Sequence, residues 1–105
     1  MKEYQIVFSP TALEDLESTL AWLADEAPEK VAEWYQSIKT HIDTLKHLPE
    51  AHPLAAENGL WGTEELRQLL FQGYPSKYRV IYTLKDDTVQ ILSIRHGARR
   101  FLHEE

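Results

Sequence analysis

Two helical stripes of apolar residues, separated by one proline, constrain the fold of this chain most strongly. Ser9-Pro10 precedes the first stripe and suits the N-cap and first position of a helix, which we expect to run from about residue 10 to 25. Pro28 starts the second helix, and Leu48-Pro49 ends it. Because only a few residues join them, the helices should form an antiparallel hairpin. The stripes consist of Leu13, Leu16, Leu20 and Leu23, then Val31, Trp34, Tyr35, Ile38, Ile42 and Leu45.

Alternation of apolar and polar residues predicts four strands around this helix pair. One lies at residues 4–8, and the others lie at residues 66–71, 77–84 and 88–95. The short turn Lys85-Asp86-Asp87 should join the last two as a hairpin. We therefore predict one α+β domain over residues 1–105, in the order β-α-α-β-β-β. The helix hairpin should cover one face of an antiparallel sheet.

The same alternation assigns side chains to the faces of the strands. Arg79 and Tyr78 fall on different faces of their strand, and burying Arg79 without a partner would be costly. We therefore expect its face to be solvated or lined by partners, with a helix acid such as Glu14 or Glu33 as the structural alternative to a ligand. In the last strand, alternation groups Val89, Ile91, Ser93 and Arg95 on one face and Leu92, Ile94 and His96 on the other.

Charge is divided unevenly along the chain. Residues 1–65 hold 4 Lys/Arg against 13 Asp/Glu, whereas residues 66–101 hold 7 against 2. A basic segment on an acidic body marks a docking surface for a charged partner, and ordinary solvation of two faces is the alternative. The absence of cysteine excludes thiol chemistry and fits a reducing cytoplasm. We expect no signal peptide and no membrane association.

The basic segment also contains the candidate site residues. Arg67, Arg79 and one of Arg95 or His96 would line a groove if the strand register brings them together, and such a set can bind phosphate or a partner carboxylate. The spacings of His41, His47 and His52 do not match a metal site, so we expect neither metal nor cofactor. The complete predicted set of binding residues is Arg67, Arg79, Arg95, His96, Arg99 and Arg100.

The order and spacing of several short motifs resemble the RelE/ParE superfamily of toxins from type II toxin–antitoxin systems. The likeness covers nearly the whole chain. The motifs are Ser9-Pro10-Thr11-Ala12, Glu65-Leu66-Arg67, Tyr78-Arg79-Val80-Ile81-Tyr82 and Val89-Gln90-Ile91-Leu92-Ser93-Ile94-Arg95-His96-Gly97-Ala98-Arg99-Arg100.

This resemblance implies a bacterial, cytoplasmic growth inhibitor of the kind that supports plasmid stabilization. It implies a cognate antitoxin that neutralises the toxin in a hetero-oligomer, and we expect an acidic antitoxin segment to dock on the basic face. The target would be DNA gyrase for a ParE-like toxin and the ribosome for a RelE-like one. A RelE-like messenger RNA endonuclease would use Arg67, Arg79, His96 and Arg99 as phosphate and acid/base groups.

Two departures from the RelE pattern favour the ParE-like activity. Phe101 lies where a catalytic tyrosine is expected, and phenylalanine has no hydroxyl with which to transfer a proton. The strand at residues 66–71 carries Arg67 and no lysine. We therefore expect a gyrase inhibitor, with a ribosome-dependent endoribonuclease and an inactive antitoxin-binding relative as the alternatives.

Overall fold

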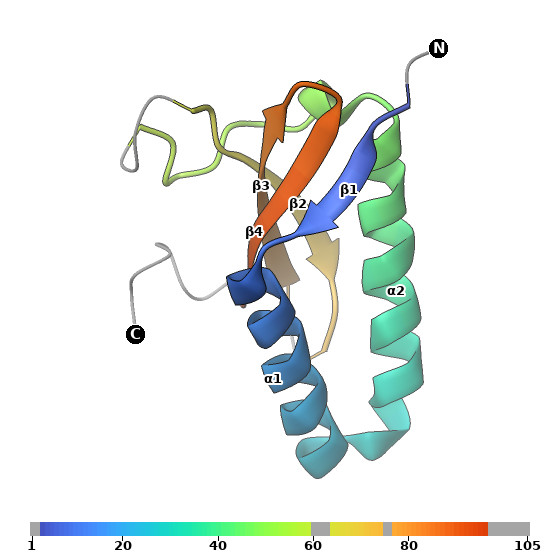
Figure 1. The fold of residues 1–105 in the computed structure, drawn as a ribbon. Helices are drawn as coiled ribbons and strands as arrows, with labels where there is room; N and C mark the ends of the chain where they lie inside the picture. Colours follow the sequence, from blue (N-terminus) through green and yellow to red (C-terminus); the bar gives the residue numbers. More distant parts are fainter. Residues whose placement is uncertain (1–2, 60–63, 75–76, 97–105) are drawn as a thin grey trace.

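A four-stranded sheet and two helices form the two layers of the protein (Figure 1). The computed structural model describes residues 3–59, 64–74 and 77–96. The predicted α+β class and element order are confirmed. The elements are β1 (Gln5–Phe8), α1 (Pro10–Glu26), α2 (Val31–Asp43), β2 (Arg67–Gln72), β3 (Lys77–Lys85) and β4 (Thr88–His96), with single 3-10 turns at Pro28–Lys30, Thr44–Lys46 and Pro49–Ala51.

The strands follow the order β1-β4-β3-β2 across the sheet. β2 and β4 both pair with β3 in the antiparallel sense, as expected for neighbouring hairpin strands. β1, however, pairs parallel with β4, from Gln5 opposite Thr88 to Phe8 opposite Ile91. The sheet is therefore mixed rather than wholly antiparallel. This pairing joins strands that the helices and the β2–β3 region separate in sequence, and strand alternation contains no signal for it.

α1 begins as the sequence predicts. The Ser9 hydroxyl accepts a hydrogen bond from the Ala12 N–H at 3.0 Å, and Pro10 occupies the first turn. The helix ends at Glu26, one residue beyond the expected boundary. The second predicted helix is shorter than expected, because its first and last turns have 3-10 geometry. No helix in the described residues is long and apolar enough to cross a membrane.

The main core lies between the sheet and the two helices. Trp34 of α2 packs against Phe71 and Tyr78, with ring centroids 5.9 Å and 5.3 Å away. Apolar side chains of α1, α2 and all four strands complete this layer. Its fully or nearly fully buried members include Leu23, Ile38, Ile42, Leu45, Leu69, Val80, Tyr82, Val89, Ile91 and Ile94.

A β-bulge in β4 overturns the predicted face assignment of that strand. Tyr82 pairs with Ile91 and Ile81 pairs with Ser93, so Leu92 has no opposite residue. As a result Ile91 and Ile94 both pack in the helix-side core, whereas strict alternation placed them on opposite faces. The prediction was wrong because one extra residue reverses the alternation beyond it.

α1 covers the part of β4 that β1 does not reach. β1 pairs only as far as Ile91. Beyond that point, Asp15 of α1 accepts hydrogen bonds from the Ser93 hydroxyl at 2.8 Å and from the Ile94 N–H at 2.9 Å. The Ser9 hydroxyl donates to the Leu92 carbonyl at 3.0 Å. The helix thus provides partners for polar groups along the strand edge, which would otherwise be a template for aggregation.

Candidate functional site

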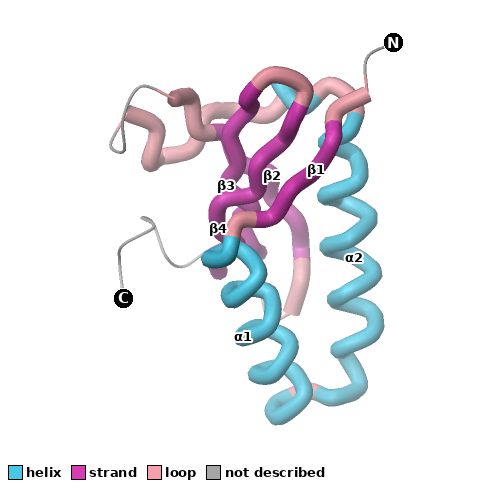
Figure 2. The backbone as a smooth tube through the Cα atoms, viewed as in Figure 1, coloured by secondary structure: helices cyan, strands magenta, loops and turns pink. Residues whose placement is uncertain are grey.

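A loop segment closes the sheet face that lies away from the helices; we call residues 53–58 the strap. In Figure 2 the loop that contains it lies to the left of the sheet and α2 lies to the right. The Gln68 N–H donates to the Pro53 carbonyl at 3.0 Å, and the Ala55 N–H donates to the Leu66 carbonyl at 2.7 Å. A small apolar cluster of Ala55, Leu66 and Ile81, with Leu92 against it, lies on the same side.

A buried ion pair fastens the strap to the sheet. The two terminal nitrogens of Arg79 donate to the two carboxylate oxygens of Glu57 at 3.0 Å and 2.9 Å, and one also donates to the Gln68 side-chain oxygen at 3.2 Å. Glu57 is 0% exposed and Arg79 is 7% exposed. This bidentate geometry is the strongest form of Arg–carboxylate contact. The guanidinium of Arg79 is therefore held by an acid of the same chain.

The partner of Arg79 is not one of the helix acids that the sequence suggested. Glu14 and Glu33 are exposed residues of α1 and α2, and these helices pack on the opposite face of the sheet (Figure 1). Glu57 lies between Ala56 and Asn58 in a loop without helical or strand periodicity. The only available signal was indirect, since a buried arginine requires an acid within reach. That requirement does not choose among the 17 acidic residues of the chain.

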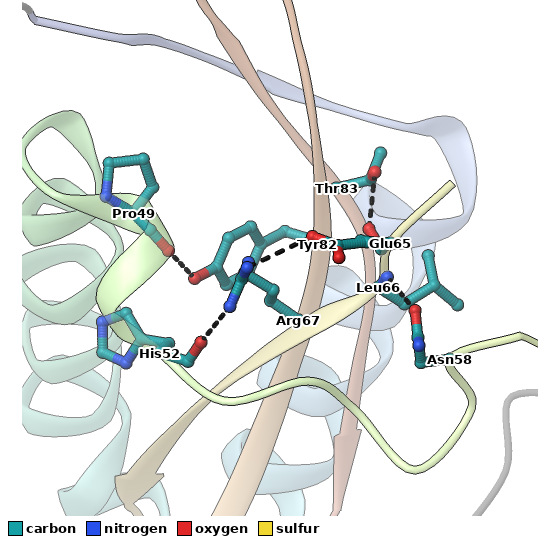
Figure 3. A network of polar contacts seen from close by, with 8 residues as sticks. All are labelled: Pro49, His52, Asn58, Glu65, Leu66, Arg67, Tyr82 and Thr83. Atoms are coloured by element: carbon teal, nitrogen blue, oxygen red, sulfur yellow. Dashed lines mark hydrogen bonds and ion pairs between the residues drawn. The ribbon is translucent and has the colours of Figure 1, made fainter. Parts of the chain in front are cut away.

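Arg67 lies on the other face of the sheet from Arg79. It is the cross-strand partner of Tyr82, whose ring is buried in the helix-side core. Its guanidinium donates to the His52 carbonyl at 2.7 Å and to the Glu65 carboxylate at 3.2 Å (Figure 3). The groove predicted to contain both Arg67 and Arg79 does not form, because the strand register separates them.

Contacts around Arg67 hold both ends of residues 49–58, the segment that contains the strap (Figure 3). The Tyr82 hydroxyl donates to the Pro49 carbonyl, and burial raises the pKa of Tyr82 to about 12 although the positive charge of Arg67 acts to lower it. Burial also lowers the pKa of His52. At the far end, the Leu66 N–H donates to the Asn58 side-chain oxygen at 2.8 Å. These contacts are structural anchors and leave Arg67 half-buried.

Arg95 and His96 end up on different faces near the end of β4. Arg95 is 9% exposed and is the cross-strand partner of Arg79, whereas His96 is opposite Tyr78 and its ring lies 5.3 Å from the Tyr78 ring. Both contribute to a cleft of ≈ 410 Å³ between β4 and α1. Arg99 and Arg100 lie outside the described residues. The register therefore brings Arg79 and Arg95 together as a cross-strand pair, and Arg95 and His96 to one cleft, whereas Arg67 lies apart from them.

A second, more apolar hollow lies between β1 and the two helices. It measures ≈ 450 Å³, and we call it the helix groove. Leu13 and Tyr35 line it and are 47% and 45% exposed. The other lining residues are Ile6, Phe8, Leu16, Ile38, Lys39, Ile42, Asp43 and Lys46. No group of three or more His, Asp or Glu residues within the described ranges could hold a metal ion.

Comparison with known proteins places the chain in a family. Residues 6–101 match the family described as "ParE toxin of type II toxin-antitoxin system, parDE". This chain belongs to the ParE toxin family. A solved structure titled "Chromosomal ParDE TA system from P. aeruginosa" has the same fold as this ParE toxin, with a TM-score of 0.69 and 18% sequence identity over 90% of this chain and 96% of that one. Among curated proteins, none matches.

Proposed function

We propose that this ParE toxin acts by binding DNA gyrase rather than by cutting RNA. The observation that carries this proposal is the buried Glu57–Arg79 pair. An RNA-cleaving site built from Arg67, Arg79 and His96 would need these groups to meet one phosphate. Arg79 instead holds an internal carboxylate, Arg67 lies on the opposite face, and His96 lies beside Tyr78. This arrangement supports a toxin that works through protein contacts.

We also propose that a cognate antitoxin neutralises the toxin in a cytoplasmic hetero-oligomer. The helix groove suits the apolar side of an antitoxin helix, because Leu13 and Tyr35 are exposed there without a partner helix in the described chain. An acidic part of the antitoxin would then meet the basic residues of β2 to β4. The charge-reversal variant Arg79→Glu is a poor test of this contact, since it would bury two carboxylates together.

Inhibition of gyrase tests the proposed target directly. Purified toxin added to gyrase and relaxed plasmid should block supercoiling at concentrations that arrest growth, and addition of the antitoxin should restore it. Absence of inhibition would refute the gyrase proposal. Transcripts cut at codon boundaries during arrest would instead establish the ribosome-dependent endonuclease, and normal colony formation without antitoxin would establish an inactive relative.

The helix groove can be tested with a matched pair of variants on α1. Leu13→Asp places a charge in the groove and should weaken antitoxin binding by roughly tenfold to a hundredfold, which corresponds to one interface anchor. Ala21→Asp changes an exposed residue of the same helix outside the groove and should leave the affinity unchanged. Equal affinities for both variants would place the antitoxin elsewhere.

A further inference from the structure

We infer that the sheet face beneath the strap is a carboxylate-binding site, occupied by Glu57 in the isolated chain and open to an acidic side chain of a partner when the strap lifts. The inference deepens the proposed function, since it assigns a receptor to the acidic antitoxin segment. It rests on that proposal only for the identity of the partner. The site itself follows from the contacts of Arg79, Gln68 and the strap.

The geometry of the site matches one planar carboxylate. Both terminal nitrogens of Arg79 point at the two oxygens of Glu57, at 3.0 Å and 2.9 Å. The side-chain oxygen of Gln68 accepts from the same guanidinium at 3.2 Å and so fixes its orientation. Arg95 is the direct cross-strand neighbour of Arg79. A preorganised guanidinium of this kind is a general receptor for carboxylates.

A carboxylate fits this site better than a phosphate. Arg79 presents a planar pair of donors, which a carboxylate matches with two parallel bonds. Gln68 places an acceptor oxygen beside the site, and this oxygen would repel a second negative charge on the ligand. The neighbouring side chains of Ala55, Leu66 and Ile81 are apolar and buried, so they offer no further donors to a tetrahedral dianion.

Exchange of one carboxylate for another avoids the main energetic barrier to opening. Removing Glu57 alone would leave the guanidinium of Arg79 buried without its carboxylate, which is strongly unfavourable. A partner carboxylate that enters as Glu57 leaves restores both hydrogen bonds. Glu57 meanwhile becomes solvated, so its own desolvation is reversed. The exchange therefore depends on how firmly the remainder of the strap is held.

Apolar burial contributes little to holding the strap closed. Ala55 is its only buried apolar residue, whereas Leu54 is 44% exposed and Ala56 is also exposed. Backbone hydrogen bonds through Pro53 and Ala55 connect it to β2 and to Leu66. The Asn58 side-chain oxygen accepts from the Leu66 N–H at 2.8 Å, and Leu54 forms an isolated bridge with Arg67. Gly59, with a φ of 89° that other residues rarely adopt, follows directly. Segments with so little buried surface open locally without global unfolding.

Chemical rescue of a truncated side chain tests the site. Glu57→Ala leaves space for a small anion, so acetate at ten times its dissociation constant should raise the melting temperature by about 5 °C relative to chloride at equal ionic strength. Glu57→Gln fills the same space with a neutral amide and should not respond, nor should Glu57→Ala combined with Arg79→Gln. An equal response of all three variants would refute the site, and a stronger response to phosphate would refute the carboxylate assignment.

A second measurement uses the unaltered chain and remains available if Glu57→Ala does not fold. A glutamate-rich peptide should accelerate hydrogen exchange at the Ala55 and Gln68 amides about tenfold, because these amides close the strap. The Ile94 amide, bonded to Asp15, should not change. The same peptide with glutamines is the control. Unchanged exchange at Ala55 and Gln68 would overturn the proposed opening of the strap. Neither experiment involves gyrase, so failure of this inference can be told apart from failure of the gyrase proposal.

Discussion

The two faces of the sheet are closed in different ways. The helix side is covered by α1 and α2 over a continuous apolar core. The strap side is covered by a short loop, a cluster of Ala55, Leu66 and Ile81, and one buried ion pair. Apolar packing is non-directional and accumulates with area, whereas an ion pair depends on both partners being in place. The helix side is therefore held by packed apolar area, and the strap side depends on one directional contact.

Breaking the ion pair should have the largest effect on stability. Arg79→Met leaves the carboxylate of Glu57 buried without a positive partner, and we expect a loss of about 3–5 kcal/mol in the free energy of unfolding. Urea denaturation measures this loss. The double variant Glu57→Met with Arg79→Met removes both charges and should recover much of it. A double variant as unstable as Arg79→Met alone would show that the ion pair is not the reason for the loss.

A core truncation on the helix side should follow in size. Ile38 of α2 is 2% exposed, and Ile38→Ala should lower the free energy of unfolding by about 2–5 kcal/mol through lost apolar contacts and a cavity. The matched control is Leu70→Ala in β2, where the side chain is 48% exposed, with an expected change within about 0.5 kcal/mol. Similar losses for the two variants would remove the distinction between packed and open surfaces.

A smaller loss of stability should show whether the strap opens independently of the rest of the fold. Asn58→Ala removes the side-chain acceptor of the Leu66 N–H, and the expected loss is about 1 kcal/mol. Exchange of the Leu66 amide should become faster while that of the Ile94 amide, held by Asp15, stays the same. Equal acceleration at both amides would mean that strap and core open together.

The pH dependence at Tyr82 should be the least visible effect, since it lies outside the neutral range. Burial raises the pKa of Tyr82 from 10.0 to about 12, so the fold favours its neutral form. The stability that this contributes is present below pH 10 and is lost as pH rises through 12. Burial also raises the pKa of Tyr78. Phenolate absorbance should therefore show a late-titrating component that Tyr82→Phe removes, while that of Tyr78 remains. Ionisation of all tyrosines near pH 10 in the folded protein would contradict this.

Local features of the fold were predictable from sequence. Ser9-Pro10 and the apolar stripes located the helices, and the Asp86-Asp87 turn located the last hairpin, because each signal depends on neighbouring residues. The parallel pairing of β1 and the bulge at Leu92 were missed, because both depend on how distant segments meet. The bulge in particular reverses side-chain direction with no composition signal at its position.

The candidate site was less predictable than the fold. The sequence left open whether the face of Arg79 is solvated or lined by partners, and it suggested Glu14 or Glu33 as the acid. Glu57 was not identified, because loop geometry rather than periodicity brings it to the sheet. The register of β2 then placed Arg67 on the far side from Arg79. Sequence spacing gives the face of a residue within a strand that has no bulge, and only the pairing of strands relates that face to the face of the next strand.

The parallel pairing of β1 with β4 has a consequence for synthesis of the toxin. Ser9 and Leu92, which are 83 positions apart, are joined by a hydrogen bond. The hydrogen bond from the Ser93 hydroxyl to Asp15 of α1 also depends on β4. β1 therefore cannot pair until residues 88–91 of β4 have been synthesised and have left the ribosome. We expect chains that terminate before β4 to lack the pairing partner of β1 and to leave its backbone groups unpaired.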